Sequence, residues 1–183
     1  SQEIWHGIDI GRYHLKGVYS VGIKRRRHSS FSAPAEMMCT SRVGRDGDIT
    51  DAAMGLGEAT SSFSGPITIA NQGRLVTLRP WDPSQCVIAA GIHNRLIHFP
   101  IRPGSKVFVL DCSLQTLSHI ADIVGQTGRV VGVMWHQQPQ LTSAQLTVFF
   151  KLYPNVSVIR ADVGTATLET YERMLSLPQS SKQ

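Results

Sequence analysis

Most of the candidate functional residues lie in one stretch, Arg102–Asp122, which reads RPGSKVFVLDCSLQTLSHIAD. The pattern predicts a turn, an apolar strand at Lys106–Leu110, a loop and a helix at Thr116–Val124. A strand, a loop and a helix in this order open a nucleotide-binding α/β unit. The loop of such a unit is glycine-rich, because its backbone N–H groups must come close to the ligand.

The loop of this stretch, Asp111–Gln115, contains no glycine. Asp111 and Asp162 each follow an expected strand, so both carboxylates could face one pocket, although acids at strand ends are commonly just solvated. Cys112 lies next to Asp111, whose negative charge should raise the pKa of the thiol and lower its reactivity. We therefore expect the frame of a cofactor site without its contact residues.

A second group of candidate residues is the basic run Lys24, Arg25, Arg26 and Arg27. Such a run can bind RNA phosphates, and each contact makes the affinity more sensitive to salt; a solvated hairpin loop is the alternative. The net charge of +5 is spread evenly, with 10 basic and 7 acidic residues in 1–80 and 8 and 6 in 81–183. This balance suits a protein near nucleic acid. Because only 17% of the residues are charged, we expect partners to cover part of the surface.

Metal, disulfide and membrane chemistry are not indicated by the sequence. Cys39, Cys86 and Cys112 are far apart and lack a C-x-x-C spacing, and His93 and His98 have no third ligand near them. No apolar run approaches the roughly 18 residues of a membrane span. The first residues, SQEIWHGIDI, resemble neither a signal peptide nor an Arg-rich transit peptide. A transit segment removed earlier is left open.

After residue 81, expected helices and strands alternate along the chain. We expect helices at 83–95, 116–124, 143–153 and 167–175, and apolar strands at 106–110, 130–134 and 156–160. Asp82 is the expected N-cap of the first helix, and Thr142 opens a capping box with Gln145. This alternation predicts a parallel sheet with right-handed crossovers. Strand order 3-2-1 would leave Lys106–Leu110 at an edge that needs covering.

Residues 1–80 predict a different kind of unit. His14–Ile23 is an expected strand, residues 29–65 are weakly patterned and loop-like, and residues 66–70 and 74–78 form a hairpin around Gly73. The expected fold class is therefore α/β. It comprises a small irregular N-terminal β domain (1–80), a partial, three-stranded Rossmann-like domain (81–178) and a polar tail (179–183).

Several of these segments resemble the fibrillarin family. The resemblance runs in order from about residue 10 to residue 175 and is most specific between Pro103 and Gly125. The blocks that carry it are Arg79–Pro83, similar to R-x-W-N-P; Ile101–Leu110, similar to IKPGAKVLYL; Leu117–Gly125, similar to VSHVSDIVG; Gly128–Val133, similar to G-x-VYAV; Pro154–Val156, similar to PNI; and, more weakly, His14–Tyr19, similar to H-E-G-V-F.

The resemblance implies the fold of an S-adenosylmethionine-dependent RNA 2′-O-methyltransferase that works in box C/D ribonucleoproteins and docks on a Nop-type scaffold protein. The cofactor loop of the family, G-A-A-S-G-T-T, aligns with Asp111–Thr116, where both glycines are replaced. Met134 stands where the family has a ribose-binding acid, and Val87 where it has a catalytic lysine. Asp162 keeps the acid near the adenine. The family's remaining catalytic Asp and Lys lie in later strands, which have no counterpart in this sequence.

From these departures we expect a protein that is not an enzyme. It would be a pseudo-methyltransferase that binds no S-adenosylmethionine and serves as a structural part of a large ribonucleoprotein in pre-rRNA processing or ribosome biogenesis. The vestigial pocket positions would be Asp111, Cys112, Ser113, Met134 and Asp162, with no catalytic residue and no metal. The expected partners are ribonucleoprotein proteins, such as a Nop-type scaffold or a chain that covers Lys106–Leu110, with RNA nearby and no membrane.

Two alternatives stay open at this point. One is half of a split S-adenosylmethionine-dependent RNA 2′-O-methyltransferase that another chain completes. The other is a self-associating fold without an RNA role, which covers its open edge by dimerisation. The nucleolus or nucleus is the expected location, and a mitochondrial ribosomal particle is the alternative.

Overall fold

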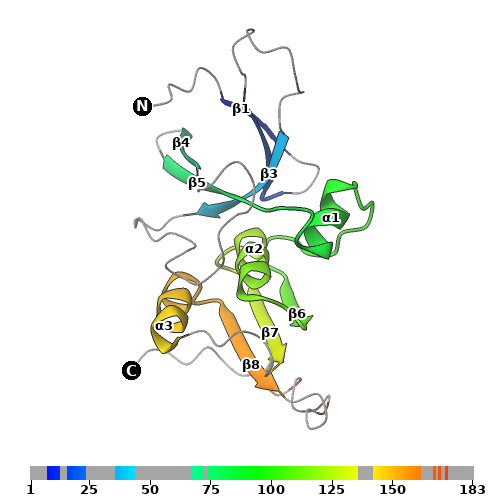
Figure 1. Ribbon diagram of the computed structural model, residues 1–183, viewed down its shortest axis with the longest axis vertical. Helices are drawn as coiled ribbons and strands as arrows, with labels where there is room; N and C mark the ends of the chain where they lie inside the picture. Colours follow the sequence, from blue (N-terminus) through cyan, green and yellow to red (C-terminus); the bar gives the residue numbers. More distant parts are fainter. Residues whose placement is uncertain are drawn as a thin grey trace.

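The computed structural model of the chain describes residues 8–12, 16–23, 36–43, 67–71, 74–135 and 142–161, together with residues 167, 169 and 172. Within these residues an antiparallel sheet and a parallel sheet are joined by helices (Figure 1). The mixed α/β architecture with a parallel Rossmann-like sheet, expected from the sequence, is confirmed. The expected helix at 167–175 lies largely outside the described residues.

The antiparallel sheet has the strand order β1-β2-β3-β5-β4. Its strands are β1 (Ile8–Arg12), β2 (Val18–Ile23), β3 (Glu36–Val43), β4 (Ile67–Asn71) and β5 (Arg74–Pro80). The expected hairpin is β4 and β5, with Asn71 opposite Arg74. The prediction of a loop over residues 29–65 is wrong for β3. In β3 the polar residues Thr40 and Ser41 are buried together with apolar ones. The sequence therefore lacks the alternation of apolar and polar residues that would predict a strand.

The parallel sheet has the order β6-β7-β8 and contains β6 (Lys106–Leu110), β7 (Arg129–Trp135) and β8 (Val156–Ala161). All three strands agree with the sequence expectation to within one residue at each end, and so does the strand order. In the described part of the chain, β6 lies at the edge of this sheet and pairs with β7.

Helix α3 (Ser143–Leu152) packs on the parallel sheet, whereas α1 (Val87–His93) packs against the antiparallel sheet and α2 (Leu114–Val124). α3 opens with the predicted capping box, in which Gln145 N–H donates to Thr142 Oγ1 and Thr142 N–H donates to Gln145 Oε1. α1 begins later than predicted. Asp82 accepts a hydrogen bond from the N–H of Ser84 at 2.8 Å, but the chain closes a turn there rather than a helix. The predicted N-cap therefore caps a turn.

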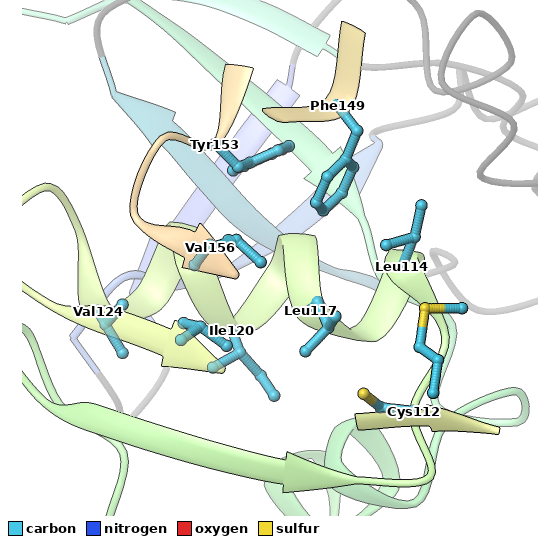
Figure 2. Close-up of a cluster of buried hydrophobic side chains, with 11 residues drawn as sticks. Cys112, Leu114, Leu117, Ile120, Val124, Phe149, Tyr153 and Val156 are labelled. Atoms are coloured by element: carbon cyan, nitrogen blue, oxygen red, sulfur yellow. The ribbon is translucent and has the colours of Figure 1, made fainter. Parts of the chain in front are cut away.

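Helix α2 (Leu114–Val124) lies between the two sheets in Figure 1. Eight of its eleven residues are buried, which a helix with only one covered face would not show. Figure 2 shows the side chains of Leu117, Ile120 and Val124 pointing from α2 toward the parallel strands, in one cluster with Phe149 of α3. Gly125 ends the helix in a left-handed conformation with φ of 67°. α2 is thus the central element of the described structure.

The approach of α2 to the parallel sheet is close enough to require glycine on the strand. A Cβ placed on Gly132 of β7 would lie 2.4 Å from Cδ1 of Leu117. Leu117 is fully buried, so its side chain would have to shift within a packed core to admit a Cβ. In dinucleotide-binding folds, a glycine at the start of the helix permits this close packing of helix and strand. In this protein the glycine is Gly132, on the strand.

The antiparallel sheet and the helices share a hydrophobic cluster. Its buried members come from β2, β3, α1, α2 and the segments between β5 and β6: Val18, Met38, Trp81, Ala89, Ile92, Phe99 and Ile123. The domain limits 1–80, 81–178 and 179–183 stay a prediction. No helix among the described residues is long and apolar enough to span a membrane.

Candidate functional site

The carboxyl ends of β6, β7 and β8 meet at one edge of the parallel sheet, where open α/β sheets bind their ligands. The register pairs Leu110 with Val133. Asp111 therefore follows β6 at the level of Met134, the next residue of β7. The N-terminus of α2 begins three residues after Asp111, at Leu114. The strand, the loop and the helix expected from the sequence are thus present in this order, with the helix beginning two residues earlier than predicted.

Asp111 turns the chain at the end of β6 in a left-handed conformation, with φ of 50°. This region is open to glycine and is tolerated by Asp and Asn, whereas other side chains are strained in it. The backbone conformation for which glycine would be chosen is therefore present in a loop that has no glycine. The exposed Asp111 side chain stands at the sheet edge.

Ser113 caps α2. Its Oγ accepts a hydrogen bond from the N–H of Thr116 at 3.2 Å, and its carbonyl accepts from the N–H of Leu117 at 3.1 Å. The N–H groups of the first helical positions have no partner inside a helix, and the helix dipole adds partial positive charge there. The loop residues Asp111 and Ser113 are both exposed, so this end of α2 opens to the surface.

Cys112 lies inside the protein rather than at the site surface. It is 4% exposed, and its Sγ is 3.7 Å from the carbonyl oxygen of Val109 and 3.9 Å from that of Val133. Burial, and to a lesser extent the negative charge of Asp111, raises the pKa of this thiol to about 12. The predicted effect of Asp111 is present, but burial is the larger cause. Cys112 is a protonated core residue near neutral pH.

Met134 is also a core residue. It is 7% exposed and belongs to the same cluster as Cys112 and Leu114. A thioether cannot accept hydrogen bonds from two ribose hydroxyls as a carboxylate does. Among the described residues, Asp111 is the carboxylate at this sheet edge. The backbone frame of the site therefore fits a nucleoside cofactor, whereas the side chain at position 134 does not fit its ribose.

Other residues singled out from the sequence lie elsewhere. Lys24, Arg25, Arg26, Arg27 and Asp162 are outside the described residues, so their roles stay predictions. His119 is fully buried and stacks on Trp81, with ring centroids 4.7 Å apart. His93 and His98 are exposed. Within the described part of the chain, no three His, Cys, Asp or Glu side chains come together as a metal site would require.

Sequence reasoning missed a buried polar cluster, which we call the clasp, formed by Thr40, Arg79, Ser118, His119 and Asp122. Arg79 Nη1 donates to Asp122 Oδ2 at 2.6 Å, and Arg79 Nη2 donates to Ser118 Oγ at 2.8 Å. Thr40 Oγ1 donates to Asp122 Oδ2 at 2.9 Å. Arg79 and Thr40 lie on the antiparallel sheet and the other three residues on α2. The available signal was Ser118 and Asp122, which are four residues apart on one helix face otherwise expected to be apolar.

The hydroxyl of Thr40 also determines the tautomer of His119. Thr40 Oγ1 and His119 Nδ1 are 2.8 Å apart. Since Thr40 has one hydroxyl proton and donates it to Asp122, it accepts from Nδ1–H of His119. The clasp is therefore a directed set of hydrogen bonds among histidine, threonine, serine, carboxylate and guanidinium.

Comparison with known proteins shows which family the chain resembles. Residues 59–175 match the family model described as Fibrillarin. A fibrillarin-like rRNA/tRNA 2′-O-methyltransferase of Thermococcus onnurineus is 50% identical over 56 residues, which are 30% of this chain and 25% of that protein. The rRNA 2′-O-methyltransferase fibrillarin of Giardia intestinalis is 33% identical over 97 residues, 52% of this chain and 29% of that protein. The matches thus span less than a third of these relatives.

Two solved structures share the fold. Aeropyrum pernix fibrillarin in complex with natively bound S-adenosyl-L-methionine has a TM-score of 0.57 and 21% identity, over 85% of this chain and 57% of that one. The Methanococcus jannaschii fibrillarin pre-rRNA processing protein has a TM-score of 0.50 and 19% identity, over 86% and 56%. At these identities the likeness concerns the fold alone.

Two of our expectations are wrong in view of these relatives. The prediction of a pseudo-methyltransferase that is not an enzyme is overturned by relatives that are rRNA 2′-O-methyltransferases. The prediction of no S-adenosylmethionine is overturned by the family's solved structure with that cofactor bound. One of the departures behind these expectations, the absence of glycine from the loop, does not remove the backbone conformation, because Asp111 adopts it.

Proposed function

The chain belongs to the fibrillarin family, and we propose that its described residues form the cofactor-binding end of an S-adenosylmethionine-dependent RNA 2′-O-methyltransferase. The observation that carries this proposal is the left-handed Asp111 between β6 and the capped N-terminus of α2. That conformation brings loop backbone and helix N–H groups to the carboxyl edge of the sheet without glycine. The relatives' activity supplies the reaction.

The residues of the site divide into backbone and side-chain contributions. The backbone of Asp111–Ser113 and the first turn of α2 would hold the polar groups of the cofactor, since their N–H groups lie at the open end of the helix. Asp111 would offer a carboxylate to a hydroxyl or ammonium group of the ligand. Cys112 and Leu114 would close the pocket floor, because both are buried in the core beneath the loop. S-adenosylmethionine, when bound, supplies the methyl group.

Calorimetric titration of S-adenosylmethionine into the chain tests the proposal. We expect saturable 1:1 binding with a dissociation constant of about 100 μM or lower, about −5.5 kcal/mol. Asp111→Ala should weaken binding, because it strains the left-handed turn and removes the carboxylate, whereas Asp111→Gly should keep the turn and lose only the carboxylate. Thr142→Ala, at the N-cap of α3, is the matched control and should bind like the wild type. Absence of binding by the wild-type chain would contradict the proposal.

The second part of the proposal concerns the edge of β6. It takes up the alternative that the chain is one half of a split methyltransferase. β6 lies at the edge of the described parallel sheet, and its central residues Val107, Phe108 and Val109 are only half-buried. An apolar edge strand of this kind can pair with a further parallel strand. We expect another chain to supply that strand together with the base for the 2′-hydroxyl.

Copurification tests this second part. A tagged chain should retain a protein with the complementary strands of a methyltransferase fold, and crosslinks should reach Lys106 at the start of β6. Lys151 of α3, which is also exposed, is the control position for crosslinking. Retention of a second copy of the chain alone, through the same edge, would contradict the split enzyme and favour dimerisation.

The RNA substrate and the assembly are also part of the proposal. The relatives' names point to ribosomal RNA, and they include the eukaryotic fibrillarins of Giardia intestinalis and Dictyostelium discoideum. We expect the chain to work in a ribonucleoprotein, with a Nop-type scaffold as partner and the nucleolus as location. Lys24–Arg27 would bind phosphates, so replacing these four residues by serine should lower RNA affinity and flatten its salt dependence. An unchanged salt slope in a filter-binding series would rule out that contact.

A further inference from the structure

The clasp reaches the end of α2 at which the cofactor is proposed to bind. Ser118 Oγ accepts from Arg79 Nη2 and donates to the carbonyl oxygen of Gln115 at 2.7 Å. Gln115 is the second residue of α2 and lies in the first helical turn, directly after the Ser113 cap. Two consecutive hydrogen bonds therefore connect Arg79 on β5 of the antiparallel sheet to the first turn of α2.

The clasp can fix the position of α2 relative to the antiparallel sheet because its central charged groups are buried. The Arg79 side chain is fully buried and that of Asp122 is 2% exposed. Arg79 also lies over the ring of Tyr153, 5.7 Å from its centroid, at the end of α3. Since a buried guanidinium needs its acceptors in place, Arg79 can move only together with α2. The antiparallel sheet therefore holds α2 on the face opposite the parallel sheet.

Each face of α2 constrains a different degree of freedom. The contact of Leu117 with Gly132 sets how closely the helix approaches β7, but apolar contacts permit a small slide along the helix axis. The hydrogen bonds to Ser118 and Asp122 are directional and lose strength when the atoms shift. They therefore set the axial position and rotation of α2, and with them the position of its first turn.

We propose that Arg79, Ser118 and Asp122 are positioning residues: through the clasp, the antiparallel sheet sets the position of the first turn of α2 for cofactor binding. The inference rests on the proposed function, because it assumes that the cofactor binds at α2. Whether the clasp holds the first turn of α2 can, however, be measured without the cofactor. Neither Arg79 nor Ser118 belongs to the cofactor edge itself. Their effect on the cofactor would pass through Gln115 and the Ser113 cap.

The test removes the hydroxyl that links Arg79 to Gln115. Ser118→Ala should speed amide hydrogen exchange of Thr116 and Leu117, whose N–H groups are bonded to Ser113, by about tenfold. Leu146, bonded in the same way to Thr142 at the start of α3, should exchange at the wild-type rate. The matched control is Thr147→Ala, which removes a similar hydroxyl-to-carbonyl bond from α3, of 2.8 Å to Ser143.

The second readout is S-adenosylmethionine itself. In Ser118→Ala the dissociation constant should rise by about fivefold or more, whereas Thr147→Ala should leave it unchanged. Arg79→Lys gives a second variant, which keeps a charge opposite Asp122 but cannot reach both Asp122 and Ser118 with one rigid fork. It should raise exchange at Thr116 and Leu117 in the same direction, and it decides the matter if Ser118→Ala does not fold.

The outcomes separate the inference from the proposed function. Faster exchange confined to the first turn of α2, with weaker cofactor binding, supports the inference. Unchanged exchange at Thr116 and Leu117, or an equal rise at Leu146, overturns it, because the clasp would then act on overall stability alone. If the wild-type chain binds no S-adenosylmethionine, the proposed function fails, while the exchange data still decide whether the clasp positions α2.

Discussion

Helices α2 and α3 follow neighbouring parallel strands and begin in the same way, yet they are held very differently. Each opens with a hydroxyl cap, Ser113 or Thr142, that accepts from an N–H three residues on. α2 has eight buried residues of eleven and α3 one of ten, Phe149. The cap alone therefore does not distinguish a site from a surface helix. Because α2 packs between the two sheets, its N-terminus is held in place more firmly than that of α3. This difference supports the proposal that the cofactor binds at α2.

The largest effect should come from breaking the buried ion pair that holds α2. Asp122→Ala leaves the buried Arg79 guanidinium without its carboxylate and should lower the free energy of unfolding by about 3–5 kcal/mol. The double variant Arg79→Met, Asp122→Leu removes both charges and should recover most of that loss. Urea denaturation followed by circular dichroism measures both. Equal instability of the single and double variants would show that the pair is not the cause.

The apolar face of α2 should be the next most sensitive. Gly132→Ala places a methyl group 2.4 Å from Leu117 Cδ1 and should destabilise the protein by about 1–3 kcal/mol. Gly91→Ala in α1 is the control, because its Cβ would meet Leu96 Cδ2 at an ordinary 3.7 Å. That variant should stabilise the protein by about 0.5–1 kcal/mol through helix propensity. Thermal unfolding of both variants makes the comparison; similar losses would mean that α2 does not pack closely on β7.

The turn that leads into α2 should show a smaller effect. Asp111→Ala should cost roughly 1 kcal/mol, because alanine is strained at φ of 50°, while Asp111→Gly should be neutral or slightly stabilising. Chemical denaturation of the two variants side by side isolates the backbone term, since both lack the carboxylate. If alanine and glycine give the same stability, the left-handed conformation is not held in solution.

The buried thiols should give the smallest effect, at alkaline pH. Burial raises the pKa of Cys39, and burial together with Asp111 that of Cys112, from an ordinary value of 9.0 to about 12. The folded state therefore keeps these protons longer than the unfolded state. Their contribution is complete below about pH 9 and is lost as the pH rises from 9 toward 12. Stability measured from pH 8 to 11 should fall less steeply in Cys39→Ala and Cys112→Ala than in the wild type, and parallel curves would contradict the shifts.

Much of the fold around α2 and α3 could be read from the sequence, because apolar runs and caps are local signals. The strands at 106–110, 130–134 and 156–160 and the Thr142 capping box were of this kind. β3 could not be predicted, since its polar residue Thr40 is buried by partners on α2 that are 79 and 82 residues away in sequence. The same holds for Arg79, which looks like a surface charge before Trp81. Hydrogen bonds between polar groups that are far apart in the sequence produce no periodic pattern from which they could be predicted.

At the site, the order of strand, loop and helix could be predicted from the sequence, whereas the prediction that no cofactor binds was wrong. The strand, the loop and the helix predict the carboxyl edge of β6, but the absence of glycine from the loop does not exclude a cofactor. Residue type predicts backbone conformation only statistically, and Asp is among the residues that enter the left-handed region. A loop should therefore be judged by its φ angles as well as by its glycines.

The most direct test of the account is an amide NMR titration of the labelled chain with S-adenosylmethionine, which reports on both helix N-termini at once. We predict saturable shifts at Asp111–Gln115 and unchanged signals at Thr142–Gln145. Such a result would assign the cofactor to the clasped helix and to the turn at Asp111. Unchanged signals at Asp111–Gln115 at millimolar cofactor, or equal shifts at both helices, would contradict it.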